Sequence, residues 1–146
     1  MIDSFRFENF WLNKYYNRPV YYKDIWFKSN HVAICYEMCK DRSDYVKKVF
    51  SYCDNVHANI NLNKIGIRED WDTVKNEIVL KVTASRFFQN DDLKEKLLAT
   101  EGKELIYSNN VDEHYWGVCN GVGKNTYGKI LMEIRDYLKE EMKNGR

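Results

Sequence analysis

The sequence contains very little of what usually separates domains. Among 146 residues, proline occurs once, at Pro19, and glycine seven times. No proline-rich linker, internal repeat or low-complexity tract divides the chain. Its length lies close to the commonest size of a single domain. We therefore expect one domain over residues 1–146.

The sequence also lacks a long hydrophobic run and an excess of charge. No apolar stretch approaches the roughly 20 residues that span a bilayer, and "MIDSFRFENFW" has acidic residues where a secretory signal would be apolar. Lys and Arg number 23 against 22 Asp and Glu, a net charge of +1. The basic excess of non-specific nucleic-acid binders is missing. We expect a cytoplasmic protein with no membrane partner.

The four cysteines allow two interpretations. Cys35-x3-Cys39 followed by Cys53-x3-His57 supplies four residues of the types that bind zinc. However, this is not the usual spacing of a zinc knuckle, and "AICYEMC" has the pattern of an amphipathic helix. Buried thiols are favoured, and zinc stays open as the alternative.

Secondary-structure signals are clearest for helices. Short aromatic segments predict strands at 5–12 and 19–27, with a turn near Lys23–Asp24. Asn-rich residues 55–68 are expected to form a loop with short β-structure, and "KELIYSN" a short strand. The sequence predicts an α+β fold, predominantly helical, with a small N-terminal β-hairpin. Apolar periodicity and capping residues predict helices from His31, over 43–53, over about 70–90, after Asp91, and over about 127–143. Ser29 or Asn30 can cap the first of these helices.

A glycine-rich loop, "WGVCNGVGKN", leads into the last of these helices. Asn125 can cap the helix, its first amides would attract an anion, and Lys124 and Lys129 add positive charge. The spacing fits neither a Walker loop nor a dinucleotide fingerprint. By itself the loop is therefore better explained as a turn with a cap than as a phosphate site.

Common catalytic signatures are absent. The three histidines have no metalloprotease or triad spacing, and no Gly-x-Ser-x-Gly motif occurs. Trp71 and Trp116 follow acidic stretches, an association found where rings stack on a nucleoside and acids bind its hydroxyls. Taken singly, each tryptophan is better explained as a core residue.

A set of motifs follows in a fixed order over about residues 66–135. Its members are Arg68-Glu69-Asp70-Trp71, Arg86-Phe87-Phe88-Gln89, Leu93, Leu97-Leu98, Thr100, Trp116-Gly117, Gly123-Lys124-Asn125, Gly128, Leu131-Met132 and Arg135. This ordered set resembles the NADAR/YbiA-like family.

The upstream half of the chain resembles the same family less fully. Asn9-Phe10 and Phe27-x-Ser29 resemble family segments. The family typically has Glu-His at the start of its first helix, where this chain has His31 and Val32. Glu37, six residues later, lies about 240° around a helix from His31, which makes it a poor substitute.

The resemblance implies a YbiA-like fold and hydrolysis of an N-glycosidic bond. Family members cleave phosphorylated riboflavin-pathway intermediates or remove ADP-ribose from guanine, so the implied partner is a ribosyl phosphate, an ADP-ribose-type ligand or an ADP-ribosylated nucleic acid. No metal or other cofactor is implied. Helix amides would help to bind phosphate. The candidate catalytic residues are Glu113, Asp112 and His31; the candidate substrate-binding residues are Arg68, Asp70, Trp71, Trp116, Gly117, Lys124 and Asn125.

Three hypotheses follow from this resemblance. The first is an active N-glycosidase, supported by the C-terminal motifs. The second is a catalytically impaired module that binds a nucleotide or ADP-ribose, suggested by the altered Glu-His position. The third is a structural protein whose aromatic residues are core. Core packing does not explain the order of the motifs, so the enzyme and the binder are preferred.

Overall fold

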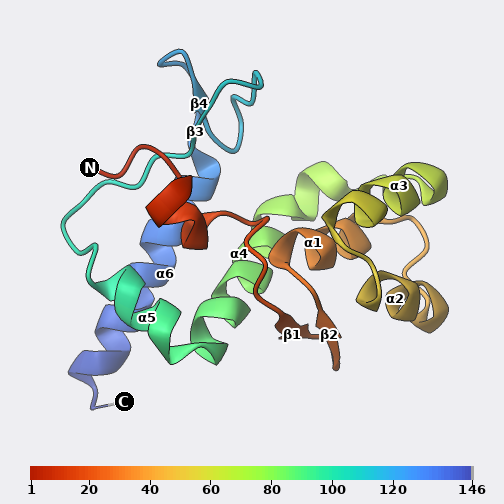
Figure 1. Ribbon diagram of the computed structural model, residues 1–146, viewed down its shortest axis with the longest axis horizontal. Helices are drawn as coiled ribbons and strands as arrows, with labels where there is room; N and C mark the ends of the chain where they lie inside the picture. Colours follow the sequence, from red (N-terminus) through yellow and green to blue (C-terminus); the bar gives the residue numbers. More distant parts are fainter. Residues whose placement is uncertain (146) are drawn as a thin grey trace. The chain divides into compact units, whose positions relative to one another are not determined.

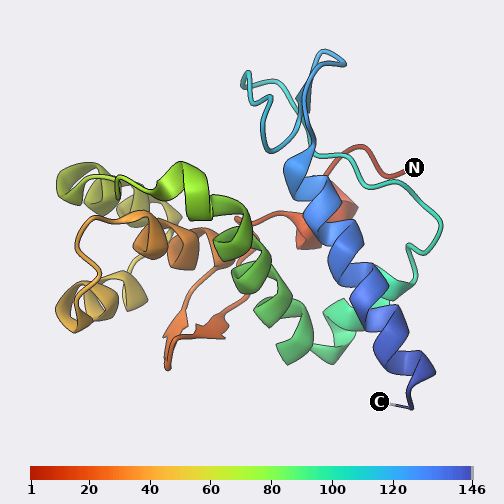
Figure 2. The ribbon, with the colours of Figure 1, turned by 180° about the vertical axis from the view of Figure 1, so that it is seen from behind.

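The computed structural model describes residues 1–145, which form two compact units (Figures 1 and 2). One unit contains residues 14–89, and the other contains residues 1–13 with the chain from Asn90 onwards. The predominantly helical α+β fold with an N-terminal hairpin is confirmed. The expected single domain over residues 1–146 stays a prediction.

Helix α1 is the centre of the 14–89 unit. It runs from Asn30 to Met38, and its residues 30–37 are all buried. It packs against α2 (Asp44–Ser51), α3 (Asn55–Ile65), α4 (Trp71–Gln89) and the hairpin of β1 (Val20–Tyr22) and β2 (Ile25–Phe27). Side chains on every face of α1 are therefore fixed by neighbouring elements of the same unit.

The starts of these helices follow from capping residues. The hydroxyl of Ser29 accepts a hydrogen bond from the amide of Val32 at 3.2 Å, as the sequence predicts for the start of α1. The expected loop at 55–68 is wrong, because residues 55–65 form α3. Asp54 accepts from the amide of His57 at 2.8 Å, and Gly66 ends the helix with φ +92°. These two caps outweigh the weak helix propensity of asparagine.

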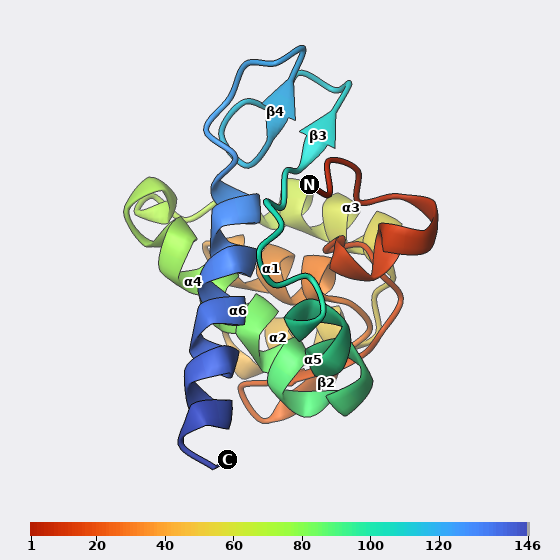
Figure 3. The same cartoon turned by 90° about the vertical axis from the view of Figure 1, so that its left-hand side faces the viewer.

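The second unit contains a 3-10 helix, η1, where a strand was expected. It runs from Phe7 to Leu12. The unit also contains α5 (Asp91–Leu98), α6 (Thr126–Lys143) and a small parallel pair, β3 (Ser108–Asn109) and β4 (Val118–Cys119). The strand expected over 103–109 is thus reduced to its last two residues and a bridge between Leu105 and Ile2. Figure 3 shows β3 and β4 beyond the first turn of α6.

Several motif residues have structural contacts. Gln89 at the end of α4 accepts from the amide of Tyr21 at 2.9 Å and donates to its carbonyl at 2.6 Å. The buried guanidinium of Arg135 on α6 donates to the carbonyls of Thr100 and Lys103 at 2.8 and 2.7 Å. These motif positions therefore stabilise the fold.

Within residues 1–145, no helix is both long enough and apolar enough to cross a membrane.

The hairpin turn gives a prediction about stability. Lys23 and Asp24 both have left-handed backbones, with φ +51° and +70°, as a type I′ turn requires. Non-glycine residues are strained there by about 1–2 kcal/mol, offset in part by the flexibility that glycine adds to the unfolded chain. Asp24→Gly should therefore raise the free energy of unfolding in urea by about 0.5–1 kcal/mol. Lys28→Gly, at a position outside the left-handed region, should lower it; the same sign for both variants would contradict the explanation.

Candidate functional site

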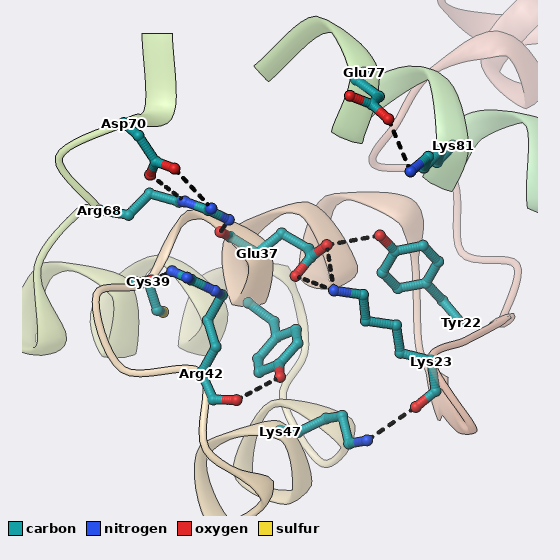
Figure 4. A network of polar contacts seen from close by, with 11 residues as sticks. Tyr22, Lys23, Glu37, Cys39, Arg42, Lys47, Arg68, Asp70, Glu77 and Lys81 are labelled. Atoms are coloured by element: carbon teal, nitrogen blue, oxygen red, sulfur yellow. Dashed lines mark hydrogen bonds and ion pairs between the residues drawn. The ribbon is translucent and has the colours of Figure 1, made fainter. Parts of the chain in front are cut away.

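A buried carboxylate, Glu37, connects α1 to the hairpin (Figure 4). The hydroxyl of Tyr22 donates to its Oε2 at 2.6 Å, and the ammonium of Lys23 lies 3.1 Å from its Oε1. Burial, and then the hydrogen bond to Glu37, raise the pKa of Tyr22 well above its usual value. Both carboxylate oxygens therefore have partners within the unit, which favours a structural role for Glu37.

The candidate substrate-binding pair Arg68 and Asp70 lies next to this network. Arg68 donates from Nε and Nη2 to the two carboxylate oxygens of Asp70, at 2.6 and 3.0 Å. Its Nη1 donates to the backbone carbonyl of Glu37 at 3.2 Å. The carboxylate of Asp70 raises the pKa of Arg68. The third candidate here, Trp71, is half-buried at the start of α4. A phosphate at Arg68 would have to share the guanidinium with Asp70.

His31 occupies a different environment on α1. Its Nε2 lies 2.7 Å from Oδ1 of Asn59 on α3, and its ring packs on Tyr15 with centroids 4.4 Å apart. Burial, reinforced by the charge of Lys14, lowers the pKa of His31 to about 4. The imidazole is therefore neutral near pH 7. Because Oδ1 of Asn59 is an acceptor, Nε2 carries the ring hydrogen and Nδ1 presents a lone pair.

Two buried groups at the start of α1 have unmet hydrogen-bonding capacity. Within the described chain, Nδ1 of His31 and both amide atoms of Asn30 have no hydrogen-bond partner. Asn30 is 0% and His31 6% exposed. A buried polar group without a partner costs about 1–3 kcal/mol, so such groups call for an explanation. A polar ligand or water that reached this point would meet one donor and two acceptors.

Cys35 lies beside His31 without being activated by it. Its sulfur is 3.4 Å from Nε2 of His31, and burial raises its pKa to about 11. A neutral thiol beside a neutral imidazole is not a nucleophilic pair. The alternative zinc site is also wrong: among residues 1–145, Cys35, Cys39, Cys53 and His57 do not gather into a group of ligands. Instead, Nδ1 of His57 lies 2.8 Å from Asp54.

In the second unit, the candidate catalytic carboxylate Glu113 is held by the backbone. Its Oε2 accepts from the amides of Tyr115 and Trp116, at 2.7 and 2.8 Å. These bonds fix the carboxylate beside the half-buried Trp116 ring, which packs edge-on against Tyr115 at 4.9 Å. The other candidate, Asp112, points elsewhere, with Oδ1 2.6 Å from Nε2 of His114. Glu113 is thus the more ordered of the two.

The glycine-rich loop does not present helix amides to an anion. The amides at the start of α6 already donate to carbonyl groups of the chain just upstream, so that expectation is wrong. The ammonium of the exposed Lys124 lies 5.5 Å from the centre of the Tyr115 ring. Four backbone amides donate to backbone carbonyls in this way: Lys124 to His114 at 2.7 Å, Asn125 to Gly117 at 3.2 Å, Thr126 to Tyr115 at 3.1 Å and Tyr127 to Trp116 at 2.9 Å.

Asn125 and the motif glycines fix this loop against the chain. The side chain of Asn125 does not cap α6. Its Oδ1 accepts from the amide of Tyr107, and its Nδ2 donates to the carbonyl of Leu105, both at 2.9 Å. A Cβ at Gly117 would lie 2.2 Å from the carbonyl oxygen of Tyr107. Direct substrate contacts of Gly117 and Asn125 stay predictions, beside these structural roles.

The candidate residues thus form two local groups. His31, Arg68, Asp70 and Trp71 lie in the 14–89 unit, with Arg68, Asp70 and Trp71 adjacent. Asp112, Glu113, Trp116, Gly117, Lys124 and Asn125 lie in and around the loops near β4. Sequence reasoning missed Asn30 and Asn59 as polar neighbours of the His31 position. Asn30 directly precedes His31 in the sequence, whereas Asn59 lies 28 residues after it, too far for a local pattern to connect the two.

The fold and the motifs together define a member of a known class of domains. Residues 4–139 match the NADAR domain, so the chain belongs to the NADAR family. The solution structure of the Escherichia coli protein YbiA has the same fold, with a TM-score of 0.83 and 22% identity. That similarity covers 97% of this chain and 89% of YbiA.

Curated relatives match about half of the chain. An N-glycosidase of Nostoc punctiforme is 36% identical over 74 residues, which are 50% of this chain and 47% of that protein. N-glycosidase YbiA of Escherichia coli is 36% identical over 76 residues, 51% of this chain and 47% of YbiA. A riboflavin biosynthesis protein of Vibrio vulnificus is 34% identical over 73 residues, 50% of this chain and 20% of that protein. The matched segment thus spans about half the length of each N-glycosidase and about a fifth of the longer riboflavin biosynthesis protein.

The Glu37 network predicts a stability loss in Tyr22→Phe. The variant removes the donor to Oε2 of Glu37 and leaves a buried carboxylate with Lys23 alone, which should lower the free energy of unfolding by about 1.5–3 kcal/mol. Urea denaturation followed by circular dichroism measures the change. Tyr21→Phe, on the exposed face of the same strand, should stay within about 0.5 kcal/mol of wild type. Equal losses of stability in the two variants would show that the hydrogen bond to Glu37 is not the cause.

The lowered pKa of His31 predicts a stability change with pH. The unfolded chain binds a proton at this histidine below about pH 6.5, and the folded chain only below about 4. Between these values the unfolded state holds more protons, so stability falls as pH drops, by up to about 3 kcal/mol. His31→Gln should flatten that part of the urea-measured pH profile. An unchanged slope in His31→Gln would contradict this explanation.

Proposed function

We propose that the protein is an N-glycosidase that hydrolyses the C–N bond of a ribosyl phosphate or an ADP-ribose-type substrate. The observation that supports this most is NADAR membership over residues 4–139, joined to 36% identity with proteins named N-glycosidase. The proposed substrates are an amino-pyrimidine ribosyl phosphate of the riboflavin pathway and ADP-ribose attached to guanine. The relative named for riboflavin biosynthesis favours the first.

The reaction needs three things from the protein. As the C–N bond breaks, positive charge develops at C1′ of the ribose, so a carboxylate near that carbon stabilises the transition state. The leaving base must accept a proton or be hydrogen-bonded, and a water molecule must be oriented for attack at C1′. The phosphate contributes binding energy away from the reacting bond.

We assign the carboxylate role to Glu113. Its Oε2 is oriented by the amides of Tyr115 and Trp116, which leaves Oε1 to face a substrate. Asp112, paired with His114, is a weaker candidate. Near Glu113, Trp116 would stack on the base or the ribose, and Lys124 would bind phosphate. In the 14–89 unit, the candidates for these two roles are Trp71 and Arg68.

We assign His31 a role as a hydrogen-bond acceptor. With its pKa lowered to about 4, the ring is neutral at pH 7 and cannot serve as a cationic acid. Its buried Nδ1 lone pair suits a ribose hydroxyl or the attacking water. Asn30, beside it, would bind further polar atoms of the same ligand.

One activity experiment tests the assignment. The full chain is incubated with NAD, ADP-ribose, an ADP-ribosylated guanine oligonucleotide and the amino-pyrimidine ribosyl phosphates, and base release is followed by mass. We expect release from one of these classes. Glu113→Gln should lower kcat about 10³-fold, or about 4 kcal/mol in barrier, while Glu77→Gln, an exposed carboxylate on α4, should match wild type.

The second candidate function is a binding module that holds the same ligand without cutting it. The observation that favours it is the neutral His31 at the position where the family typically has glutamate, because a neutral ring gives a cationic transition state no opposing charge. His31→Glu separates the two functions. Turnover that is absent in wild type and present in the variant would exclude the enzyme and support the binder. Failure of wild type to bind any of these nucleotides would contradict both.

A further inference from the structure

Asp112 and His114, in the loop before β4, and Cys119, on β4, place one oxygen, one nitrogen and one sulfur ligand close together. Their ligand atoms all lie within 4.8 Å of one another. Asp112 and His114 are exposed, and the Cys119 side chain is buried. Within residues 1–145 this is the one group of three such side chains that meets these distances.

The ring of His114 is held in the orientation of a metal ligand. Its Nδ1 lies 2.7 Å from the carbonyl oxygen of Val122. A carbonyl only accepts, so Nδ1 carries a hydrogen and donates it. In metal-binding histidines, the same hydrogen bond from one ring nitrogen to a backbone carbonyl fixes the tautomer and leaves Nε2 as the ligand atom.

The contact between His114 and Asp112 brings two ligand types together. Nε2 of His114 lies 2.6 Å from Oδ1 of Asp112, a contact that either a proton or a metal ion satisfies. The nearby sulfur of Cys119 adds a third ligand type, which a metal ion would use and a shared proton would not.

The backbone holds the three residues in place without metal. The side chain of Asn109 accepts from the amide of Glu113 at 3.0 Å and donates to the carbonyls of Glu113 and Val118 at 2.9 and 3.3 Å. The turn after β4 is closed by the pair of hydrogen bonds between Cys119 and Val122, at 2.9 and 3.0 Å. The ligand-bearing segment is therefore fixed at both ends.

We propose that Asp112, His114 and Cys119 form a binding site for a single zinc-class transition-metal ion. Zinc takes carboxylate oxygen, imidazole nitrogen and thiolate sulfur at about 2.0–2.3 Å. Tetrahedral ligands at those distances lie about 3.3–3.8 Å apart. Metal binding would therefore move His114 and Asp112, now 2.6 Å apart, away from each other by somewhat less than about 1 Å. Magnesium and calcium, which take oxygen ligands, do not fit this set. Three protein ligands leave the fourth position to water or to another donor.

The site is independent of the proposed glycosidase reaction. Its ligands serve to fix the loop that also carries Glu113 and Trp116, and metal binding releases the thiol proton of Cys119 to solvent. In this proposal Asp112 binds the metal, and Glu113 remains the carboxylate proposed for the glycosidase reaction. An inactive protein that binds zinc, or an active one that does not, would separate the two proposals.

Titration of the metal-free full chain with Zn²⁺, followed by calorimetry, tests the site. We expect one equivalent to bind with a Kd in the micromolar range or tighter, and His114→Gln to weaken it at least about tenfold. His57→Gln is the matched control, because His57 also pairs with an aspartate, Asp54, at 2.8 Å and has no place in the cluster. No binding by wild type, or equal weakening in both variants, would overturn the proposal.

Titration with Co²⁺ tests the sulfur ligand and does not depend on the histidine variants. A thiolate ligand produces a sulfur-to-cobalt charge-transfer band in the near ultraviolet. The band should be present in wild type and lost in Cys119→Ser, with circular dichroism used to verify that the variant is folded. Cys53→Ser should keep the band. A band that survives Cys119→Ser in a folded protein would place the metal at other cysteines and overturn the assignment.

Discussion

The burial of one carboxylate, Glu37, constrains much of the 14–89 unit. A charge that is only 2% exposed is tolerated when donors surround it, and here the donors come from the hairpin. Tyr22 must end β1 facing α1, and the turn must bring Lys23 back toward Oε1. The left-handed backbone of Lys23 belongs to the type I′ turn that reverses the chain at this point. Arg68, by donating to the backbone of Glu37, also fixes the chain just before α4.

The other end of α1 has buried polar groups that nothing in the described chain satisfies. With the C-terminal end held by Glu37, the N-terminal end presents Asn30 and His31, whose polar atoms are buried without partners in the described chain. A helix whose residues 30–37 are all buried would ordinarily have apolar residues at these positions. Unmet polar groups in a rigid setting are a common mark of a site that receives its partner from outside. The groups that stabilise the helix and the polar groups without partners thus occupy opposite ends of α1.

The sequence predicted the elements with strong local signals and missed those that depend on few residues. Apolar periodicity placed α2, α4 and α6, and Ser29 placed the start of α1. The prediction from sequence failed at α3, where the caps Asp54 and Gly66 outweigh the weak helix propensity of the asparagines. It also failed at η1, whose six residues are too few to show a helical period. The predicted residues Asn125 and Gly117 show a second limit. A motif reports that a residue is needed without saying whether it contacts a ligand or, as for Asn125 with Leu105 and Tyr107, its own chain.

Whether the protein cuts its ligand depends on the chemistry that His31 can supply. A neutral imidazole with its hydrogen on Nε2 accepts at Nδ1, so it can orient water or a ribose hydroxyl. It cannot oppose positive charge at C1′, which a glutamate at the same position would do. Under the proposed function, that charge would be met by another carboxylate, and we proposed Glu113 because two backbone amides orient it.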